Sequence, residues 1–343
     1  MSSLTNYSRS MSVVKRQKVD DSLIVHDNKD VHRKGKVLYD NAVALEGHEG
    51  AVLTSRFNTS GTSLATGGMD KQILLWNLPT ESEDQEYNYG VLKGHKGAVT
   101  RVQYQDTVLV SASADSTLGI WDCETGARIR KCTGHELVIN DVSMRDETSF
   151  VSACDDGISH IWDVREKRPV GTIKSDFPIL ACTINSRRTS FYLAGIDPTI
   201  RCYDFRKLDT ANWSVEGQVD SVSSLSINHD DSILVSRSLK GIVKTFNAKD
   251  FVPKGMSRAN PFMYDGAPSG KENYLIRACF NPSSTLILSG SEDKTTTVWS
   301  YATRKMQNKY DGHNGTVIDV DHHPLLAVIA SSSTDGTVIL REI

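Results

Sequence analysis

Short hydrophobic runs recur along most of the chain, and glycine, aspartate, asparagine or serine separates each run from the next. Within residues 51–77, for example, the runs are AVLTSRF, SLATGG and QILLWN. Apolar and β-branched runs of this length between turn residues are typical of β-strands. The pattern predicts an all-β chain in which four short strands make up each unit of about 40–45 residues.

Two marks repeat in register along the chain. The first is an aromatic residue or its substitute, with successive spacings of 45, 41, 41, 43, 53 and 42 residues. These markers are Trp76, Trp121, Trp162, Tyr203, Phe246, Trp299 and Arg341. An aspartate lies six residues before six of the seven markers, and a Gly-His pair lies further upstream in four repeats. Repeats of this length with four strands each predict a seven-bladed β-propeller.

The two ends of the repeat region predict how the ring closes. The last repeat stops at Ile343, directly after its third strand, and residues 41–45 (NAVAL) precede the first Gly-His pair. Pairing these segments completes the last blade and removes an exposed sheet edge. We expect the propeller to span residues 38–343, with 41–45 as the closing strand and residues 1–37 as a disordered basic tail.

These repeats resemble the WD-repeat family over nearly the whole chain. In that family a histidine, a serine or threonine, the turn aspartate and the tryptophan form a hydrogen-bonded tetrad. The resemblance implies three complete tetrads, which are His48, Thr66, Asp70 and Trp76; His95, Ser111, Asp115 and Trp121; and His135, Ser152, Asp156 and Trp162. Because an active site does not recur in each repeat, we interpret these sets as structural and not catalytic. The six cysteines lack zinc-ligand spacing, and we expect neither a metal ion nor a cofactor.

The fifth repeat departs from the pattern at its central turn. It carries Arg237 and Lys240 where most other repeats carry aspartate. These side chains are candidate partner-binding residues, because they place positive charge on the narrow rim of an acidic body. The alternative is ordinary surface variation.

The interval of 53 residues marks extra length, which we assign to the sixth repeat at residues 250–275. Long loops that carry apolar side chains on a rigid scaffold are common binding sites. The candidate partner-binding residues there are Phe251, Met256, Phe262, Met263 and Tyr264. The alternative is a loop that packs against its own blade.

Charge divides the chain into a basic tail and an acidic body. The whole sequence has 39 basic and 42 acidic residues, and its net charge of −3 argues against a global electrostatic grip on nucleic acid. Within the tail, Lys15, Arg16 and Lys18 form a candidate nuclear-import cluster, and the alternative is a solvated tail without that role. No apolar run approaches the roughly 18 residues of a membrane span, so no membrane partner is expected.

Within the WD-repeat family, the chain resembles in particular the WD-repeat subunits of the spliceosomal U5 small nuclear ribonucleoprotein. The segments that carry this resemblance are VKRQK, LEGHEGAV, MDKQILLWN, LKGHKGAV, SASADSTLGIWDCETG, DDGISHIWDVR, DSVSSLSIN and SSSTDGTVILREI. It implies a nuclear, non-enzymatic scaffold in pre-mRNA splicing. The implied partners are the large central U5 protein and the U5 GTPase, with RNA contacted only indirectly through the particle.

A second function remains open on the same fold. The chain could be a peptide-reading WD-repeat adaptor of a ubiquitin ligase or chromatin complex. That function requires a pocket at the central channel lined by several blades.

Overall fold

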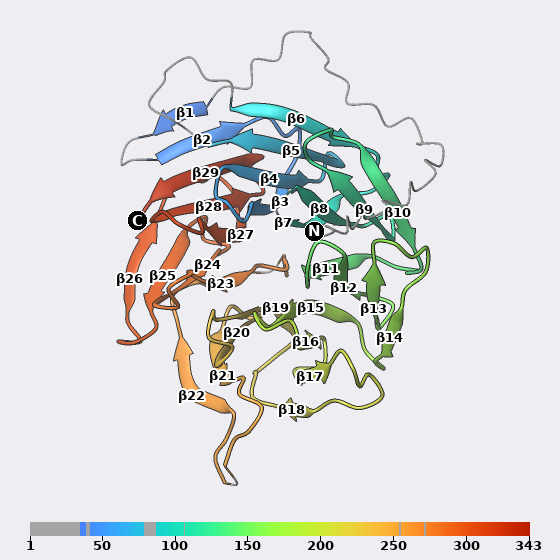
Figure 1. Ribbon diagram of the computed structural model, residues 1–343. Helices are drawn as coiled ribbons and strands as arrows, with labels where there is room; N and C mark the ends of the chain where they lie inside the picture. Colours follow the sequence, from blue (N-terminus) through green and yellow to red (C-terminus); the bar gives the residue numbers. More distant parts are fainter. Residues whose placement is uncertain (1–34, 39–41, 79–86, 106, 254, 271) are drawn as a thin grey trace, which may run out of the picture.

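The computed structural model describes residues 35–38, 42–78, 87–105, 107–253, 255–270 and 272–343. These residues form 29 strands in seven antiparallel sheets, and the sheets are arranged as blades around a central axis (Figure 1). The predicted all-β, seven-bladed propeller is therefore confirmed. Across the described ranges, the chain forms no helix that is long and apolar enough to cross a membrane.

Each blade runs from its innermost strand at the channel to its outermost strand, in chain order. Blades one to three consist of β3 (Val52–Phe57), β4 (Ser63–Gly68), β5 (Gln72–Asn77) and β6 (Asn88–Lys93); β7 (Val99–Gln105), β8 (Val108–Ser113), β9 (Thr117–Asp122) and β10 (Arg128–Thr133); and β11 (Ile139–Met144), β12 (Ser149–Cys154), β13 (Ile158–Asp163) and β14 (Gly171–Lys174). Blades four to six consist of β15 (Ile179–Ile184), β16 (Ser190–Gly195), β17 (Ile200–Asp204) and β18 (Trp213–Val215); β19 (Val222–Ile227), β20 (Ile233–Ser238), β21 (Val243–Asn247) and β22 (Ala259–Tyr264); and β23 (Ala278–Phe280), β24 (Leu286–Ser289), β25 (Thr296–Ser300) and β26 (Met306–Tyr310).

The seventh blade joins the two ends of the propeller. It consists of β27 (Val317–His322), β28 (Val328–Ser333), β29 (Thr337–Glu342), β2 (Ala42–Glu46) and β1 (Gly35–Leu38). Strand β2 pairs antiparallel with β29, and β1 then pairs with the outer edge of β2. The expected boundary between tail and propeller at residues 37 and 38 therefore needs correction, because it falls inside β1, whose backbone adds a fifth strand to the sheet. The tail residues 1–34, with the candidate nuclear-import cluster, lie outside the described residues.

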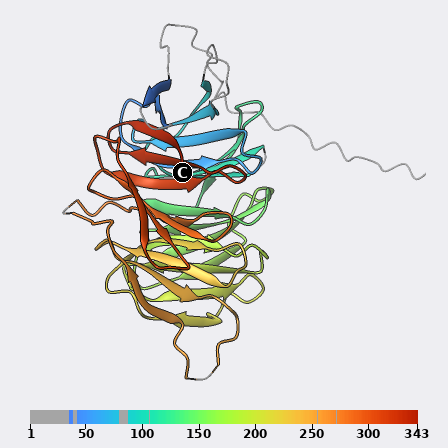
Figure 2. The ribbon, with the colours of Figure 1, turned by 90° about the vertical axis from the view of Figure 1, so that its left-hand side faces the viewer.

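The extra length near residue 250 belongs to a different blade than the spacing suggested. We assigned residues 250–275 to the sixth repeat, but β22 within this segment is the fourth strand of blade five. The marker spacing cannot separate a long loop from a displaced outer strand, because both fall between the same two markers. The connection between β21 and β22 extends beyond the rest of the molecule in both Figure 1 and Figure 2.

The hydrophobic core lies between neighbouring blades. Between blades two and three, for example, Ile120 packs in one cluster with Ile139, Phe150 and Trp162. The facing sides of neighbouring sheets thus bury each other's apolar side chains, as expected for radially repeated sheets. All six cysteines are buried and unpaired within these layers.

Candidate functional site: tetrads, channel and exposed loops

Hydrogen bonds join the four residues of each of the three tetrads. In blade three, His135 Nε2 lies 2.7 Å from Ser152 Oγ, His135 Nδ1 lies 3.0 Å from Asp156 Oδ2, and Trp162 Nε1 donates to Ser152 Oγ at 2.9 Å. The same three contacts measure 2.8, 2.8 and 2.8 Å in blade one (His48, Thr66, Asp70, Trp76) and 2.7, 3.4 and 2.8 Å in blade two (His95, Ser111, Asp115, Trp121). Each histidine links the loop that enters a blade to the turn between its second and third strands.

The direction of these hydrogen bonds follows from the donors. An indole N–H only donates and a carboxylate only accepts, so the Ser152 hydroxyl accepts from Trp162 and donates to His135 Nε2. His135 then carries its proton on Nδ1 and donates it to Asp156. Burial lowers the pKa of His135 against the opposing effect of Asp156, which favours this neutral imidazole. Every polar group of the tetrad is thereby satisfied.

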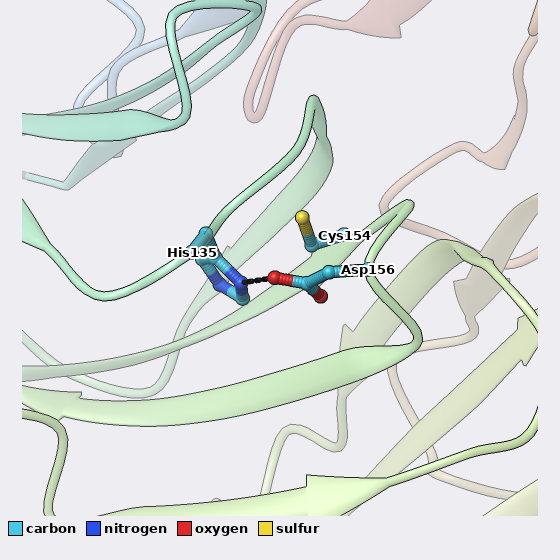
Figure 3. Close-up of side chains that lie close together, drawn as sticks. All are labelled: His135, Cys154 and Asp156. Atoms are coloured by element: carbon cyan, nitrogen blue, oxygen red, sulfur yellow. Dashed lines mark hydrogen bonds and ion pairs between the residues drawn. The ribbon is translucent and has the colours of Figure 1, made fainter.

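Figure 3 shows Cys154 beside His135 and Asp156, with their ligand atoms all within 4.8 Å of one another. A metal site needs a free imidazole nitrogen and a thiolate. Both nitrogens of His135 are engaged by Ser152 and Asp156, and burial raises the pKa of Cys154 to about 12. The geometry therefore favours the hydrogen-bonded structural role over metal binding.

Two incomplete tetrads keep part of the network. In blade seven, His313 contacts Ser331 at 2.9 Å and Asp335 at 3.3 Å, although Arg341 stands in the tryptophan position. In blade five, Gln218 replaces histidine, and its side-chain amide donates to Ser236 Oγ at 2.7 Å. Glutamine thus reaches the same hydroxyl that histidine reaches elsewhere.

Arg237 does not form a partner-binding surface, and this prediction was wrong. Its side chain is fully buried, with 0% exposure, and its guanidinium donates to Ser289 Oγ at 2.6 Å and to the carbonyl of Ala267 at 3.1 Å. Ser289 is the tetrad hydroxyl of blade six, which has no Gly-His histidine. Arg237 of blade five therefore contacts, across the blade interface, the hydroxyl that a histidine contacts in the complete tetrads, but as a hydrogen-bond donor and not as an acceptor. Burial lowers the pKa of Arg237 to about 9.

The sequence contains a signal for the contact between Arg237 and Ser289. The residue after the tetrad hydroxyl position, which Leu193 fills in blade four, is small in the other blades: Gly67, Ala112, Ala153, Ala194, Gly290 and Ser332. An arginine at this position, followed by a blade without its histidine, marks the substitution. Lys240, by contrast, is exposed as expected, and its ammonium lies 3.4 Å from the Asp220 carboxylate.

The candidate residues of the 250–275 segment divide into an exposed and a packed group. Phe251 and Met256 lie on the connection between β21 and β22 and are 79% and 69% exposed, and Met263 is also exposed. Tyr264 is instead buried, with its ring 6.2 Å from Trp299, and Phe262 packs on Tyr264 at 5.0 Å. The prediction that Tyr264 contacts a partner was therefore wrong, because the outer strand places its side chain in the core.

Arg258 fixes the connection that carries Phe251 and Met256. Its guanidinium lies 4.1 Å from the ring centroid of Trp213 on β18, and it donates to the carbonyls of Asn247 at 3.1 Å and Lys249 at 2.6 Å. A cation stacked on an indole and bonded to backbone oxygens holds both ends of the loop. Trp213 is the one tryptophan of five that is not among the seven blade markers, and this contact gives it a structural role.

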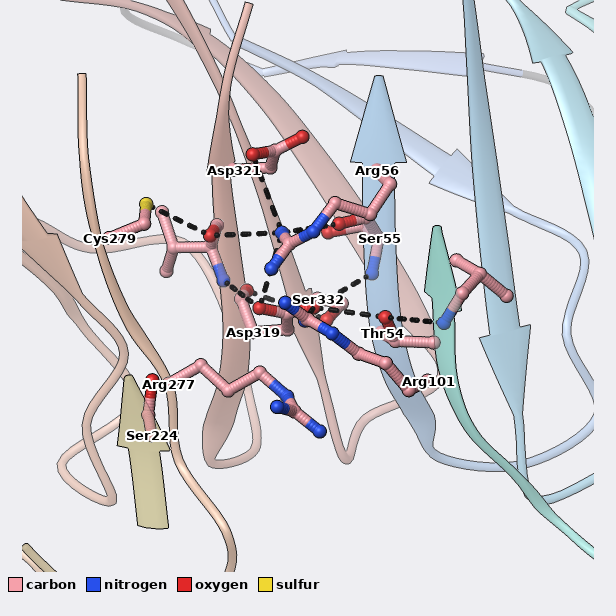
Figure 4. Close-up of polar contacts among 12 residues, drawn as sticks. Thr54, Ser55, Arg56, Arg101, Ser224, Arg277, Cys279, Asp319, Asp321 and Ser332 are labelled. Atoms are coloured by element: carbon pink, nitrogen blue, oxygen red, sulfur yellow. Dashed lines mark hydrogen bonds and ion pairs between the residues drawn. The ribbon is translucent and has the colours of Figure 1, made fainter. Parts of the chain in front are cut away.

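An ion-pair network crosses the central channel, and Figure 4 shows the part of it around Arg56, Arg101 and Asp319. Arg101 joins Asp141 at 3.0 Å and Asp319 at 2.7 Å, and Arg277 joins Asp141 at 3.1 Å. Arg56 lies 3.5 Å from Asp319. Arg56, Arg101, Asp141 and Asp319 stand on innermost strands, and Arg277 directly precedes β23, the innermost strand of blade six. The network links blades one, two, three, six and seven.

One mouth of the channel is hollow. A cavity of about 440 Å³ opens there, and every blade contributes to its wall. One residue from each blade, in order, is Arg56, Gln103, Ser143, Thr183, Ser226, Cys279 and Asp321. The wall is mostly polar, which distinguishes this cavity from a typical apolar ligand pocket.

Comparison with known proteins identifies the family. The family model described as "WD domain, G-beta repeat" matches residues 41–77, 87–122, 126–163, 268–300 and 304–341. This chain belongs to the WD-repeat family. Its WD-repeat relatives include the pre-mRNA-splicing factor cwf17 of Schizosaccharomyces pombe, at 35% identity over 96% of both chains. The U5 small nuclear ribonucleoprotein 40 kDa proteins of Homo sapiens and Dictyostelium discoideum are 33% and 31% identical, over 87% of this chain and 83% of theirs.

The family model matches the blades that keep most of the tetrad pattern and omits two blades that depart from it. They leave out residues 164–267, which contain blades four and five. These are the blades in which Tyr203 and Phe246 replace tryptophan and in which Gln218 replaces a Gly-His histidine. Both blades have all four strands; their tetrad side chains differ, and blade five also has the long connection between β21 and β22.

Proposed function

We propose that this WD-repeat chain is a non-enzymatic scaffold subunit of the U5 small nuclear ribonucleoprotein, acting in pre-mRNA splicing in the nucleus. The observation that carries the proposal is the 35% identity to a pre-mRNA-splicing factor over 96% of both chains. Relatives named as U5 proteins support the same particle. The serine, histidine and aspartate sets support a scaffold, since each has a structural use in its blade.

The proposed partners are the large central U5 protein and the U5 GTPase, with RNA held only through the particle. The connection between β21 and β22 is the candidate contact. Phe251 and Met256 expose apolar side chains on a loop that Arg258 holds in place. Exposed apolar anchors on a fixed loop lose little entropy on binding and are typical interface residues.

The peptide-reading adaptor of a ubiquitin ligase or chromatin complex is the alternative. The cavity lined by all seven blades favours it, since such a reader requires a pocket at the channel. The polar wall and the ion pairs behind it argue for a structural channel instead.

Affinity purification of the tagged chain from nuclear extract separates the two functions. We expect U5 RNA and the large U5 proteins to co-purify. The double variant Phe251→Ser and Met256→Ser should reduce their recovery at least tenfold, because it removes the two apolar side chains of the candidate contact. Both side chains are exposed, so their loss leaves the blade intact.

The matched control is Leu325→Ser with Leu326→Ser, which changes two exposed leucines of blade seven. It should leave recovery unchanged. Recovery of ligase or histone-modifying subunits without U5 RNA would replace the proposal with the alternative.

A further inference from the structure

Exposed apolar side chains gather on one face of blades three to five. We call this face the entry face: it holds the loops that enter each blade and the turns between second and third strands. Leu137, Phe177, Ile196 and Val219 lie there and are between 46% and 54% exposed. Among the described loops of this face in the other four blades, Met69 is the only exposed large apolar residue.

Backbone and side-chain hydrogen bonds show that these four side chains stand on adjoining loops. The loop of Leu137 meets the turn between β12 and β13 through Asp155 N and the carbonyl of Val138, at 3.0 Å. That turn meets the loop of Phe177 through Ser175 N and the carbonyl of Gly157, at 2.8 Å. Ile196 N donates to the carbonyl of Pro178 at 3.1 Å, directly beside Phe177. The carbonyl of Ile196 then accepts from Ser221 Oγ at 3.1 Å, two residues from Val219.

Acidic side chains surround these apolar residues. The six entry-face loops of blades three to five are residues 134–138, 155–157, 175–178, 196–199, 216–221 and 239–242. They hold seven acidic residues, which are Glu136, Asp155, Asp156, Asp176, Asp197, Glu216 and Asp220, and one basic residue, Lys240. Glu136, Asp176 and Glu216 are exposed. Asp197 is paired with Arg201 and Asp220 with Lys240, so the negative charge of this face comes mainly from Glu136, Asp176 and Glu216. This charge favours a positively charged partner and repels phosphate groups.

We propose that the entry face of blades three to five binds a polypeptide segment that interleaves lysine or arginine with large apolar side chains. Four apolar contacts spaced over three blades suit an extended or helical segment, and the acidic rim selects its charge. Nucleic acid is disfavoured, because its backbone would face the acidic rim. The proposal does not depend on the spliceosomal function.

Peptide binding to the full chain, followed by fluorescence anisotropy, tests it. Three peptides of equal length serve as probes: one alternates lysine and leucine, one glutamate and leucine, and one lysine and serine. We expect the lysine–leucine peptide to bind at least tenfold more tightly than either other peptide. Its affinity should fall with added salt, because the rim charges are exposed.

Two variants locate the binding. Phe177→Ser with Ile196→Ser, and separately Asp176→Lys, should each weaken binding of the lysine–leucine peptide about tenfold. The control Leu325→Ser with Leu326→Ser changes exposed leucines elsewhere on the propeller and should bind as the parent chain does. Thermal melting confirms that each variant is folded.

Equal binding of the three peptides, or equal loss in the control variant, overturns the proposal. Because no spliceosomal component enters the assay, failure here leaves the co-purification of U5 RNA untouched.

Discussion

Replacing Asp319 with alanine should destabilise the propeller by about 3–5 kcal/mol, the cost of breaking one side of a buried ion pair. Its side chain has 0% exposure. Its Oδ2 accepts from Arg101 at 2.7 Å, from Thr54 Oγ1 at 3.0 Å and from the Ser55 backbone N–H at 3.2 Å. Alanine removes this acceptor and leaves the Arg101 guanidinium buried with one carboxylate, Asp141. Chemical unfolding of the parent and variant chains measures the difference.

The position of Asp319 explains why the effect is large. It stands on β27 of the closing blade, and its partners stand on β3 and β7 of the first two blades. The ion pair therefore reinforces the junction at which the two ends of the chain complete the ring. A defect at this junction weakens a ring more than one on an outer strand, because closure removes the open edges of the sheet array.

A surface ion pair provides the control. Arg206 lies 3.3 Å from Asp204 and is largely exposed, so Arg206→Ala should cost less than about 1 kcal/mol. Asp319→Asn keeps the shape and one acceptor but removes the charge, and we expect an intermediate loss. If Asp319→Ala costs no more than Arg206→Ala, the channel network does not stabilise ring closure.

The same residue links stability to pH. Burial alone raises the pKa of Asp319, but Arg56, Arg101 and Arg277 outweigh burial and hold it below its ordinary value. A carboxylate whose folded pKa is lowered stabilises the protein above its unfolded pKa of about 3.9 and loses that contribution as pH falls through the folded pKa. The free energy of unfolding of Asp319→Asn should therefore fall less steeply than that of the parent chain below about pH 4.

The propeller architecture could be predicted from the sequence because the residues that mark each blade lie close together in the chain. Each tetrad spans fewer than 30 residues, so the spacing from His135 to Trp162 indicates both the blade and its hydrogen bonds. The network across the channel is different in kind, since Arg277 and Asp141 are far apart in sequence and meet only when the ring is assembled. The repeat register could place Asp141 on an innermost strand and Arg277 directly before one, but their pairing across the axis depends on three-dimensional closure.

Two errors have the same physical origin. Arg237 was expected on the surface because charged residues are mostly exposed. It is buried because the neighbouring blade lacks a histidine and offers the Ser289 hydroxyl instead. Tyr264 was expected in an exposed loop but lies in an outer strand against Trp299. In both cases a contact with another blade decided the outcome, and single-repeat patterns contain no information about that contact.

The tryptophan of blade three should be the other position with a large effect. Trp162 is fully buried between two blades and stacks on Phe150 with centroids 6.2 Å apart. Trp162→Ala should cost about 3–5 kcal/mol, from lost burial and the cavity left between the sheets. Val170→Ala on the same blade removes an exposed side chain and should change the free energy of unfolding by less than about 0.5 kcal/mol.

Milder variants separate packing from hydrogen bonding. Phenylalanine is tolerated at the equivalent position of blade five, where Phe246 is buried, so Trp162→Phe should cost clearly less than Trp162→Ala. Ser152→Ala should cost about 1–3 kcal/mol, because it leaves the Trp162 N–H and His135 Nε2 without their shared partner.

The double variant Trp162→Phe with Ser152→Ala tests the tetrad as a unit. Phenylalanine has no N–H to leave unpaired, so the double variant should cost less than the sum of the two single variants, by about 0.5–1.5 kcal/mol. Strict additivity would mean that the Ser152 hydroxyl and the indole are not energetically coupled. The tryptophan would then act through packing alone, and the replacements in blades four and five would carry no penalty in hydrogen bonding.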